Sequence, residues 1–554
     1  MMLPHFIVLS ILQNIFENYQ DSSSVKSFFK QFLLINKSWN QFIIPKLNSP
    51  KFTYINSHVP LFQFLDKYNI RYELEVWEND KFNSELYPTD RIITFTSDSL
   101  ISNQLVETLP NVQVFNCNTT RLDWSFLKSY DSSKSLKKDM SLRFLFNGER
   151  EYSLDRQLPL YQLFDCKFQW VDIKNGLVDL PFNYFKSNGN NQSVKVLKFD
   201  NATITLSLIS SLLEGLVSLE TLELSDIKVQ NPPTELTPIE LVIERIMKSK
   251  AFRETITILK IHTEQCQIES VIELMNSNSL LVTLELRINT ISINNPHHLL
   301  PLINNRTIES LTIHAFVKFI PGFTFTNLIT DENNIKSLDI SNGLYRNLHQ
   351  FSVLQSISIR SNNDLVDSII GSSLEMNLPS LTKFKFDGYG SYDLIHISAA
   401  MLQSNNYIQH LELSALSINF TTALIACNHA SLKYLKISIL KPLGEDISKL
   451  MLSLHTNTNL LQFRISKILW YLDNTLNSFP TIEQLFDILQ HNHTLTHLHI
   501  PIKSTDGPFT QVSQAQLTRC KNILDTNQSI CYVGGLDYTY QPIKQLFDLY
   551  LINN

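Results

Sequence analysis

Apolar residues recur along this chain in short alternating segments, and the clearest of them covers residues 281–289 (LVTLELRIN). Leu284 and Leu286 alternate with polar residues, which is typical of a short strand with one buried face. Asn289 follows them, and we expect its side-chain amide to satisfy backbone groups where the chain turns away from the strand. One such segment carries little weight alone, because apolar alternation is common.

The same pattern returns along most of the chain. Twelve well-formed segments start between residues 194 and 495, and most successive starts are 24 to 28 residues apart. A spacing of 37 residues after Leu219 and one of 35 after Leu460 indicate insertions, and one of 19 after Ile335 indicates a shortened repeat. The predicted strands are 194–200, 219–225, 256–262, 281–287, 308–314, 335–341, 354–360, 381–387, 408–414, 432–438, 460–466 and 495–500, preceded by weaker members at 92–97, 112–118, 142–146 and 168–174.

Between these segments the apolar spacing changes to three and four residues, which predicts helices at 204–216, 268–275 and 482–489. No single repeat can bury its own apolar face, so stacked neighbours must share one core. The period and the pattern L-x-x-L-x-L-x-x-N resemble those of leucine-rich repeats. That resemblance implies an α/β fold, a leucine-rich-repeat solenoid shaped as a right-handed horseshoe with a concave parallel sheet.

Residues 1–50 differ from the rest, because their apolar residues follow helical spacing and predict a small all-α bundle. A bundle of this size with so much apolar surface needs a partner or a neighbouring domain to cover it. The order of its residues resembles that of an F-box, a helical domain with Leu-Pro near its start and a later tryptophan. The residues that carry this resemblance are Leu3, Pro4, Ile11, Ile15, Phe16 and Trp39. The alternative is a helical cap over the open end of the repeats, which solenoids need in any case.

The remaining segments complete the predicted organisation. Residues 51–90 form a transition with a first irregular repeat, residues 91–505 the solenoid, and residues 506–554 a C-terminal cap. Within that cap we predict helices over 510–527 and 542–552 and a last edge strand at 530–533.

Composition narrows the function classes. The net charge of −6 lacks the basic bias of a nucleic-acid-binding surface, and none of the apolar runs is long enough to span a membrane. The six cysteines lack metal-binding or disulfide spacing, so we expect buried free thiols. The first residues lack the basic and small-residue features of a signal peptide, and sequons such as Asn118-Thr-Thr and Asn201-Ala-Thr are expected by chance in an asparagine-rich chain. We therefore expect a monomer in the cytoplasm or the nucleus.

Candidate chemistry is sparse. Phosphate-binding loops, metalloprotease motifs and nucleophile elbows are absent from the sequence, so we expect a non-enzyme without a cofactor. Four histidines lie close together at His491, His493, His497 and His499, and the last two would share one strand face. A metal site would need further ligands in register. We favour a polar, solvated strand face.

The residue between the last two apolar positions of each predicted strand would line the concave face, where proteins are recognised by mixed charge, tyrosine and arginine. Candidate partner-binding residues are Glu285, Arg287, Lys385, Glu412, Tyr434, Lys436 and Arg464, with Lys433 adding to a basic C-terminal end. The two resemblances together imply an F-box/leucine-rich-repeat adaptor, which docks on the Skp-type subunit of a cullin-based ubiquitin ligase and presents a protein substrate. The alternative is a stand-alone repeat scaffold for interaction or signalling, whose first 50 residues only cap the array.

Overall fold

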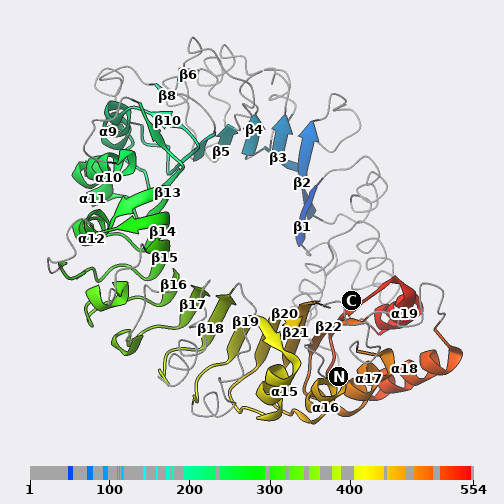
Figure 1. The fold of residues 1–554 in the computed structure, drawn as a ribbon. Coiled ribbons are helices and arrows are strands. Elements are labelled where there is room, and N and C mark those ends of the chain that lie inside the picture. The colour runs from blue at the N-terminus through cyan, green and yellow to red at the C-terminus, as the bar shows by residue number, and fades with distance from the viewer. Residues whose placement is uncertain are drawn as a thin grey trace, which may run out of the picture. The chain divides into compact units, whose positions relative to one another are not determined.

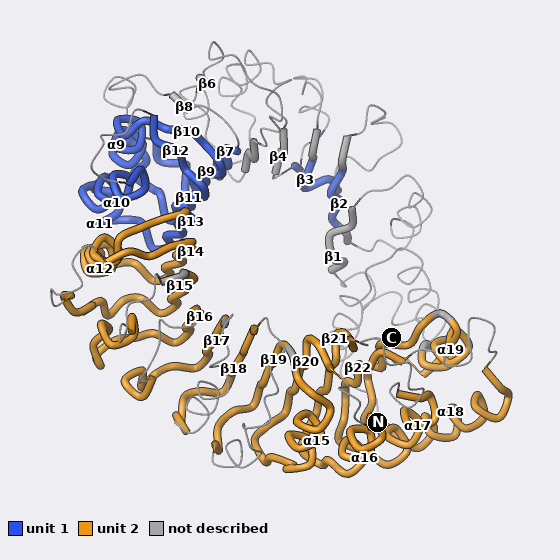
Figure 2. The backbone as a smooth tube through the Cα atoms, viewed as in Figure 1, with its two compact units in different colours: residues 1–263 blue, residues 264–554 orange. Residues whose placement is uncertain are grey.

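The structure is a computed structural model with no cis peptide bond among its described residues. It describes residues 48–53, 66, 71–78, 91–97, 109, 111–112, 114–117, 141–144, 158–159, 170–174, 178–179, 191–230, 237–293, 300–317, 324–341, 348–361, 377–388, 405–441, 446–469, 480–502 and 512–550. The chain forms two compact units, Met1–Thr263 and Glu264–Asn554, shown in Figure 2. The predicted four-part division is not tested by these units.

Strands and helices alternate along most of the described chain, and 14 of the described strands form one parallel sheet (Figure 1). Its order follows the sequence, from β7 and β9 through β11 and β13 to β23, so that each strand pairs with the next strand of the same sheet. This solenoid-like arrangement confirms the mixed α/β class and the repeated strand that the alternation predicts.

Unit 1 holds a separate parallel sheet of five described strands, which are β1 (Asn48–Thr53), β2 (Arg71–Glu78), β3 (Ile92–Ser97), β4 (Val114–Cys117) and β5 (Ser141–Phe144). Its part of the 14-stranded sheet comprises β7 (Trp170–Lys174), β9 (Val196–Asp200), β11 (Thr221–Ser225) and most of β13 (Ile258–Gln267). Two short pairs add β6 (Leu158–Pro159) with β8 (Val178–Asp179) and β10 (Thr203–Ile204) with β12 (Lys228–Val229).

The insertion after Leu219 is helical. It contains α10 (Pro238–Lys248) and α11 (Lys250–Glu254), which both pack against α9 (Leu206–Gly215). Thr237 and Glu240 form a capping box at the start of α10, and a proline occupies its first turn. The extra residues of this repeat therefore thicken the helical layer of unit 1.

Unit 2 continues with ten parallel strands, which are β14 (Thr283–Ser292), β15 (Ser310–Val317), β16 (Ser337–Ser341), β17 (Ser356–Ser361), β18 (Lys383–Gly388), β19 (His410–Ser417), β20 (Tyr434–Lys441), β21 (Gln462–Ile468), β22 (His497–Ile502) and β23 (Tyr532–Leu536). β23 ends the sheet order, so the predicted last edge strand is confirmed. The strands begin two residues later than predicted, because the first apolar residue of each segment lies in the turn before the strand. Leu281, Ile308 and Leu495 are such residues, and all three are buried.

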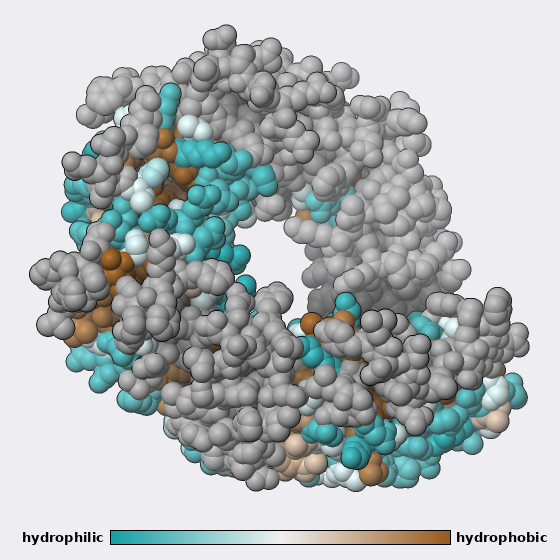
Figure 3. Space-filling model, viewed as in Figure 1, coloured by the Kyte–Doolittle hydropathy of each residue, from teal (hydrophilic) through white to brown (hydrophobic). Residues whose placement is uncertain are grey.

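Helices lie before the first of these strands, between several of them and after the last one. They are α12 (Ile268–Ser277), α15 (Ile418–Ala426), α16 (Ile447–Thr456), α17 (Ile482–His491), α18 (Gln514–Thr526) and α19 (Gln541–Leu549). Short 3₁₀ helices also occur, among them η6 (Phe325–Leu328) and η7 (Leu348–Gln350), and η7 lies in the shortened repeat after Ile335. From α15 to α19 each helix contacts the next. The exposed sides of α16–α18 are mostly hydrophilic in Figure 3.

The core lies between the strands and the helices. Leu411 and Leu413 of β19 and Leu424 and Ile425 of α15 are buried, whereas the alternate strand residues face away from the helices. Burying one such side chain contributes about 1.5–3 kcal/mol. The repeated apolar pattern therefore supplies one continuous layer within unit 2 without a disulfide among its described cysteines.

Asparagines link successive repeats at the entry to the strands. Asn492 shows the geometry: its Oδ1 accepts the backbone N–H groups of Thr494 and Leu495 at 2.9 Å, and its Nδ2 donates to the carbonyls of Leu454 and Asn457 at 2.7 and 2.8 Å. One buried amide thereby fixes its own turn and ties it to the preceding repeat. We call the residues of unit 2 whose Oδ1 accepts the N–H of the following turn in this way the asparagine ladder: Asn278, Asn305, Asn333, Asn405, Asn457, Asn492 and Asn527. The Nδ2 of Asn333 donates instead to Thr330 in its own turn and to Gln350 in the following repeat.

One repeat replaces the asparagine by His429. Its Nδ1 accepts the backbone N–H of Leu432 at 3.3 Å, and its Nε2 contacts the carbonyl oxygen of Asn405 in the preceding repeat. The imidazole thus supplies the same acceptor and donor as the amide. Asn289 does not take this role, so that expectation was wrong: it is exposed within β14, at a shift in the register with β15.

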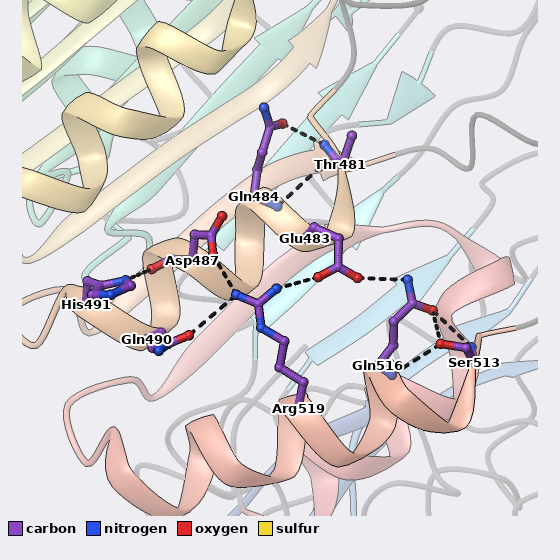
Figure 4. A network of polar contacts seen from close by, with 9 residues as sticks. All are labelled: Thr481, Glu483, Gln484, Asp487, Gln490, His491, Ser513, Gln516 and Arg519. Atoms are coloured by element: carbon purple, nitrogen blue, oxygen red, sulfur yellow. Dashed lines mark hydrogen bonds and ion pairs between the residues drawn. The ribbon is translucent and has the colours of Figure 1, made fainter.

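A polar network joins the last helices of unit 2 (Figure 4). Arg519 of α18 pairs with Glu483 and Asp487 of α17, and its guanidinium lies 5.7 Å from the centre of the Phe486 ring. Gln516 of α18 also donates to Glu483.

None of the helices that the structure describes is both long and apolar enough to cross a membrane.

Candidate functional site

The central polar positions of the strands form one row on the sheet face opposite the helices. In unit 2, backbone pairing places each of them beside the next, from Glu285 on β14 to His499 on β22. We call this set the polar row: Glu285, Thr312, Asp339, Ser358, Lys385, Glu412, Lys436, Arg464 and His499. The sequence order predicted for these residues is therefore their order in space.

At the β14 end of the row the charged residues are paired with neighbours. Arg287 Nε lies 2.7 Å from Glu285 Oε1, and register places Arg287 beside His314. His314 Nε2 lies 2.9 Å from Asp339 Oδ1. Burial acts to raise the pKa of Asp339, but the contact with His314, aided by Arg360, outweighs it and lowers that pKa.

Glu412 is the centre of a second cluster. His410 Nε2 lies 2.7 Å from Glu412 Oε1, Lys436 Nζ lies 3.3 Å from Glu412 Oε2, and Lys383 approaches to 3.7 Å. Its side chain is only 14% exposed, so these contacts satisfy a largely desolvated carboxylate. Burial acts to raise the pKa of Glu412, yet the hydrogen bond from His410 and the charge of Lys436 hold it below its ordinary value.

Aromatic rings flank this cluster on one side of the polar row. The imidazole of His410 stacks on the ring of Tyr434 with centroids 3.8 Å apart and planes 9° apart. Desolvation lowers the pKa of His410 and raises the pKa of Tyr434, so both groups are neutral near pH 7. A neutral His410 donates its Nε2–H to Glu412, which orients the carboxylate toward Lys436.

The last strands add a second aromatic group. His499 Nδ1 lies 3.1 Å from the hydroxyl of Tyr532, and the two rings are nearly parallel. His497 also stacks on Tyr532, with centroids 5.9 Å apart. Gly534 leaves room for the contact between Tyr532 and His499, because a Cβ there would lie 2.3 Å from the Tyr532 hydroxyl and 2.4 Å from His499 Nδ1. Burial lowers the pKa of both histidines, and the charge of Arg464 lowers that of His499 further.

Unit 1 repeats the pattern of alternating charge. Asp172, Lys198, Glu223 and Lys260 are neighbours by register. Lys198 Nζ donates to Glu223 at 2.6 Å, and Lys260 approaches the other oxygen of the same carboxylate at 3.8 Å. Burial acts to lower the pKa of Lys198, but the hydrogen bond and charge of Glu223 raise it overall. Side chains over β9–β13 are mostly hydrophilic in Figure 3.

The remaining residues predicted as candidates, Lys433 and the histidines near residue 495, do not lie together in one site. Lys433 does not join the polar row, as its Nζ donates to the carbonyls of Ala430 and Asn459 at the strand entry. His497 and His499 share a strand face as predicted, but His491 ends α17, where its Nδ1 contacts the carbonyl of Asp487. In the described ranges, no three His, Cys, Asp or Glu residues are grouped as a metal site would need.

The cysteines follow the expectation only in part. Cys266 and Cys520 are buried free thiols, and burial raises the pKa of Cys520 to about 12. Cys427 is half-buried, and Cys531 is exposed, contrary to the expectation. Cys531 lies one residue before β23, outside the alternation that buries its neighbours Ile530 and Val533.

The predicted docking residues lie outside the described residues, namely Leu3, Pro4, Ile11, Ile15, Phe16 and Trp39. The asparagine ladder was missed, although an asparagine three residues before the first apolar residue of a repeat (two residues at Asn333) would have indicated it. A comparison with protein-family models found no matching family, and a search of curated proteins found no similar sequence.

Proposed function

We propose that this chain is a non-catalytic leucine-rich-repeat scaffold that binds a protein along the polar row. The observation that carries the proposal is the row itself: nine polar-row residues of unit 2 stand on consecutive paired strands, on the face opposite the helices. The carboxylates Glu285, Asp339 and Glu412 are engaged by neighbouring cations or histidines rather than set as an acid/base pair. Such a pre-ordered, mixed-charge surface suits recognition of a folded partner or an extended peptide.

We further propose that the chain acts as the substrate-recognition adaptor of a cullin-based ubiquitin ligase. Support comes from the F-box-like order of residues in the first 50 positions together with the repeats that follow. In this role the first 50 residues dock on the Skp-type subunit, and the polar row holds the substrate. The adaptor increases the effective concentration of the substrate near the transferase and forms no bond itself.

Co-purification tests the adaptor role. The full chain, a chain lacking residues 1–50 and the double variant Leu3→Asp/Trp39→Ala are each purified with the Skp-type subunit present. We expect the full chain alone to retain the subunit, with circular dichroism showing that both variants keep the repeat fold. Failure of the full chain to retain it would reject the adaptor role and leave the stand-alone scaffold as the alternative function.

A further inference from the structure

Arg464 differs from the other charged polar-row residues of unit 2 in its exposure. Its side chain is exposed, and no carboxylate of the described residues lies within ion-pair distance of it. Lys385 of the polar row also has no carboxylate within ion-pair distance among the described residues, but its side chain is half-buried. By contrast, Lys436 on the neighbouring strand already contacts Glu412. Arg464 therefore presents a guanidinium whose donors are available to a ligand.

The surroundings of Arg464 suit an oxyanion. Lys436 and Arg464 occupy the polar-row positions of β20 and β21, and β20–β23 contain no carboxylate residue. Ser466 is exposed two residues beyond Arg464, so its hydroxyl shares the same face. A guanidinium flanked by a second cation and a hydroxyl forms charge-assisted, bidentate hydrogen bonds with carboxylates and phosphates.

Planar rings border this charge on both sides. His499 of β22 is the register neighbour of Arg464, and Tyr434 of β20 is paired with Gln462, two residues before Arg464 on β21. Further along, His499 and Tyr532 fix one another through their hydrogen bond and parallel rings. Rigid rings of this kind supply contact area at low entropic cost, so a bound chain would find a fixed apolar surface beside the charge.

We propose that β20–β22 bind an acidic peptide segment of the partner, with Arg464 pairing to one oxyanion and the flanking rings contacting the adjacent side chains. This inference rests on the proposed protein-binding function and gives it a ligand chemistry. The oxyanion belongs to an Asp or Glu side chain or to a phosphorylated residue, which present the same acceptors to Arg464. A single-stranded nucleic acid would use similar rings, but Glu412 beside Lys436 opposes a phosphate backbone that extends toward β19.

The test uses the full chain as bait for a random twelve-residue peptide library displayed on phage. We expect the selected peptides to be enriched in Asp and Glu. A synthetic copy of the most frequent peptide, labelled with fluorescein, then gives Kd by fluorescence polarisation. Arg464→Gln should weaken Kd at least tenfold, and Arg464→Lys should weaken it less. Arg306→Gln is the matched control and should leave Kd unchanged, because Arg306 is an exposed loop residue paired with Glu332.

Two further probes identify the source of the anion. A peptide with one phosphoserine replacing an essential Asp or Glu shows whether phosphate binds more tightly than carboxylate, and oligo(dT) is added as a competitor. Selection of neutral or basic peptides whose Kd is insensitive to Arg464→Gln would overturn this inference and leave the protein-binding function intact. Tighter, Arg464-dependent binding of oligo(dT) would overturn both. Recovery of no peptide would overturn the acidic-peptide site alone, since the co-purification experiment decides the adaptor role separately.

Discussion

Asn527 Nδ2 donates to the backbone carbonyl of Asn492 at 3.0 Å, so one member of the asparagine ladder holds the turn of the member before it. Both side chains are buried, at 4% and 3% exposure. Each amide therefore replaces water for backbone groups that would otherwise be unpaired inside the protein.

Asn492→Ala should destabilise the full chain by about 2–3 kcal/mol, because the substitution leaves buried backbone donors and acceptors without partners. His493→Ala is the control, since His493 is exposed in the same turn, and it should change stability by less than about 0.5 kcal/mol. The shift of the urea unfolding midpoint measures both. Equal midpoints for the two variants would show that the ladder does not stabilise the array.

Acid should destabilise unit 2 through His410 and Glu412. Burial lowers the pKa of His410 in the folded state from its ordinary value of 6.5. As the pH falls below 6.5, the unfolded chain therefore binds the proton more readily than the folded chain, and the folded state loses stability. The pKa of Glu412 is lowered from 4.5, so its stabilisation is present above that pH and is lost as the pH falls through its folded value.

Two variants separate these steps. His410→Gln should reduce the change of the urea midpoint with pH between pH 6.5 and the lower pKa of His410 in the folded state. Glu412→Gln should reduce that change below pH 4.5. Urea midpoints at a series of pH values measure both slopes. A wild-type midpoint that increases on acidification would contradict the assignment.

Gly535 and Gly534 should respond differently to alanine. Gly535 has φ of 92°, and a Cβ there would lie 2.2 Å from the carbonyl oxygen of Ile500, which is rigid backbone. Gly535→Ala should therefore cost about 1–3 kcal/mol or more. A Cβ at Gly534 would meet side-chain atoms that can move, so Gly534→Ala should cost less but separate Tyr532 from His499. Thermal denaturation ranks the stabilities, and a less stable Gly534→Ala variant would refute this order.

Removing the guanidinium of Arg519 should loosen α18 from α17. Arg519→Ala deletes two ion pairs and a cation–π contact near the surface, for a loss of about 1–2 kcal/mol. The loss should shrink in 1 M NaCl because exposed ion pairs are screened. Lys521→Ala on the same helix is the control and should have little effect, as Lys521 is exposed. A loss independent of salt would attribute the effect to packing alone.

The strands were predictable because their signal is local and repeated. Leu284 and Leu286 alternate within five residues, and the same alternation marks the strands from β14 to β22. The helices of the insertion after Leu219 were not predicted, although α10 carries local signals in the capping box of Thr237 and Glu240 and the proline of its first turn. The turn expected at Asn289 was wrong because β14 continues past this residue, through a shift in its register with β15.

The positions of the polar row could be predicted from the same alternation, but the contacts between its side chains could not. Pairing of Lys436 with Glu412, and the absence of such a partner for Arg464 among the described residues, depend on the conformations of side chains on adjacent strands.

The asparagine ladder also explains the sequons at Asn492 and Asn527. The hydroxyls of Thr494 and Ser529 donate to those amides, so the N-x-S/T pattern here reflects turn geometry rather than chance.

The parallel register of unit 2 sets a fixed spacing for any chain that lies across the strands. Neighbouring strands are about 4.8 Å apart, whereas the side chains on one face of an extended peptide recur about every 6.8 Å. Three strand spacings, about 14.4 Å, come within about 1 Å of two side-chain periods, about 13.6 Å, whereas the strands between are out of phase. An extended ligand can therefore align side chains with only about every third strand, which would concentrate its specificity at a few residues such as Arg464.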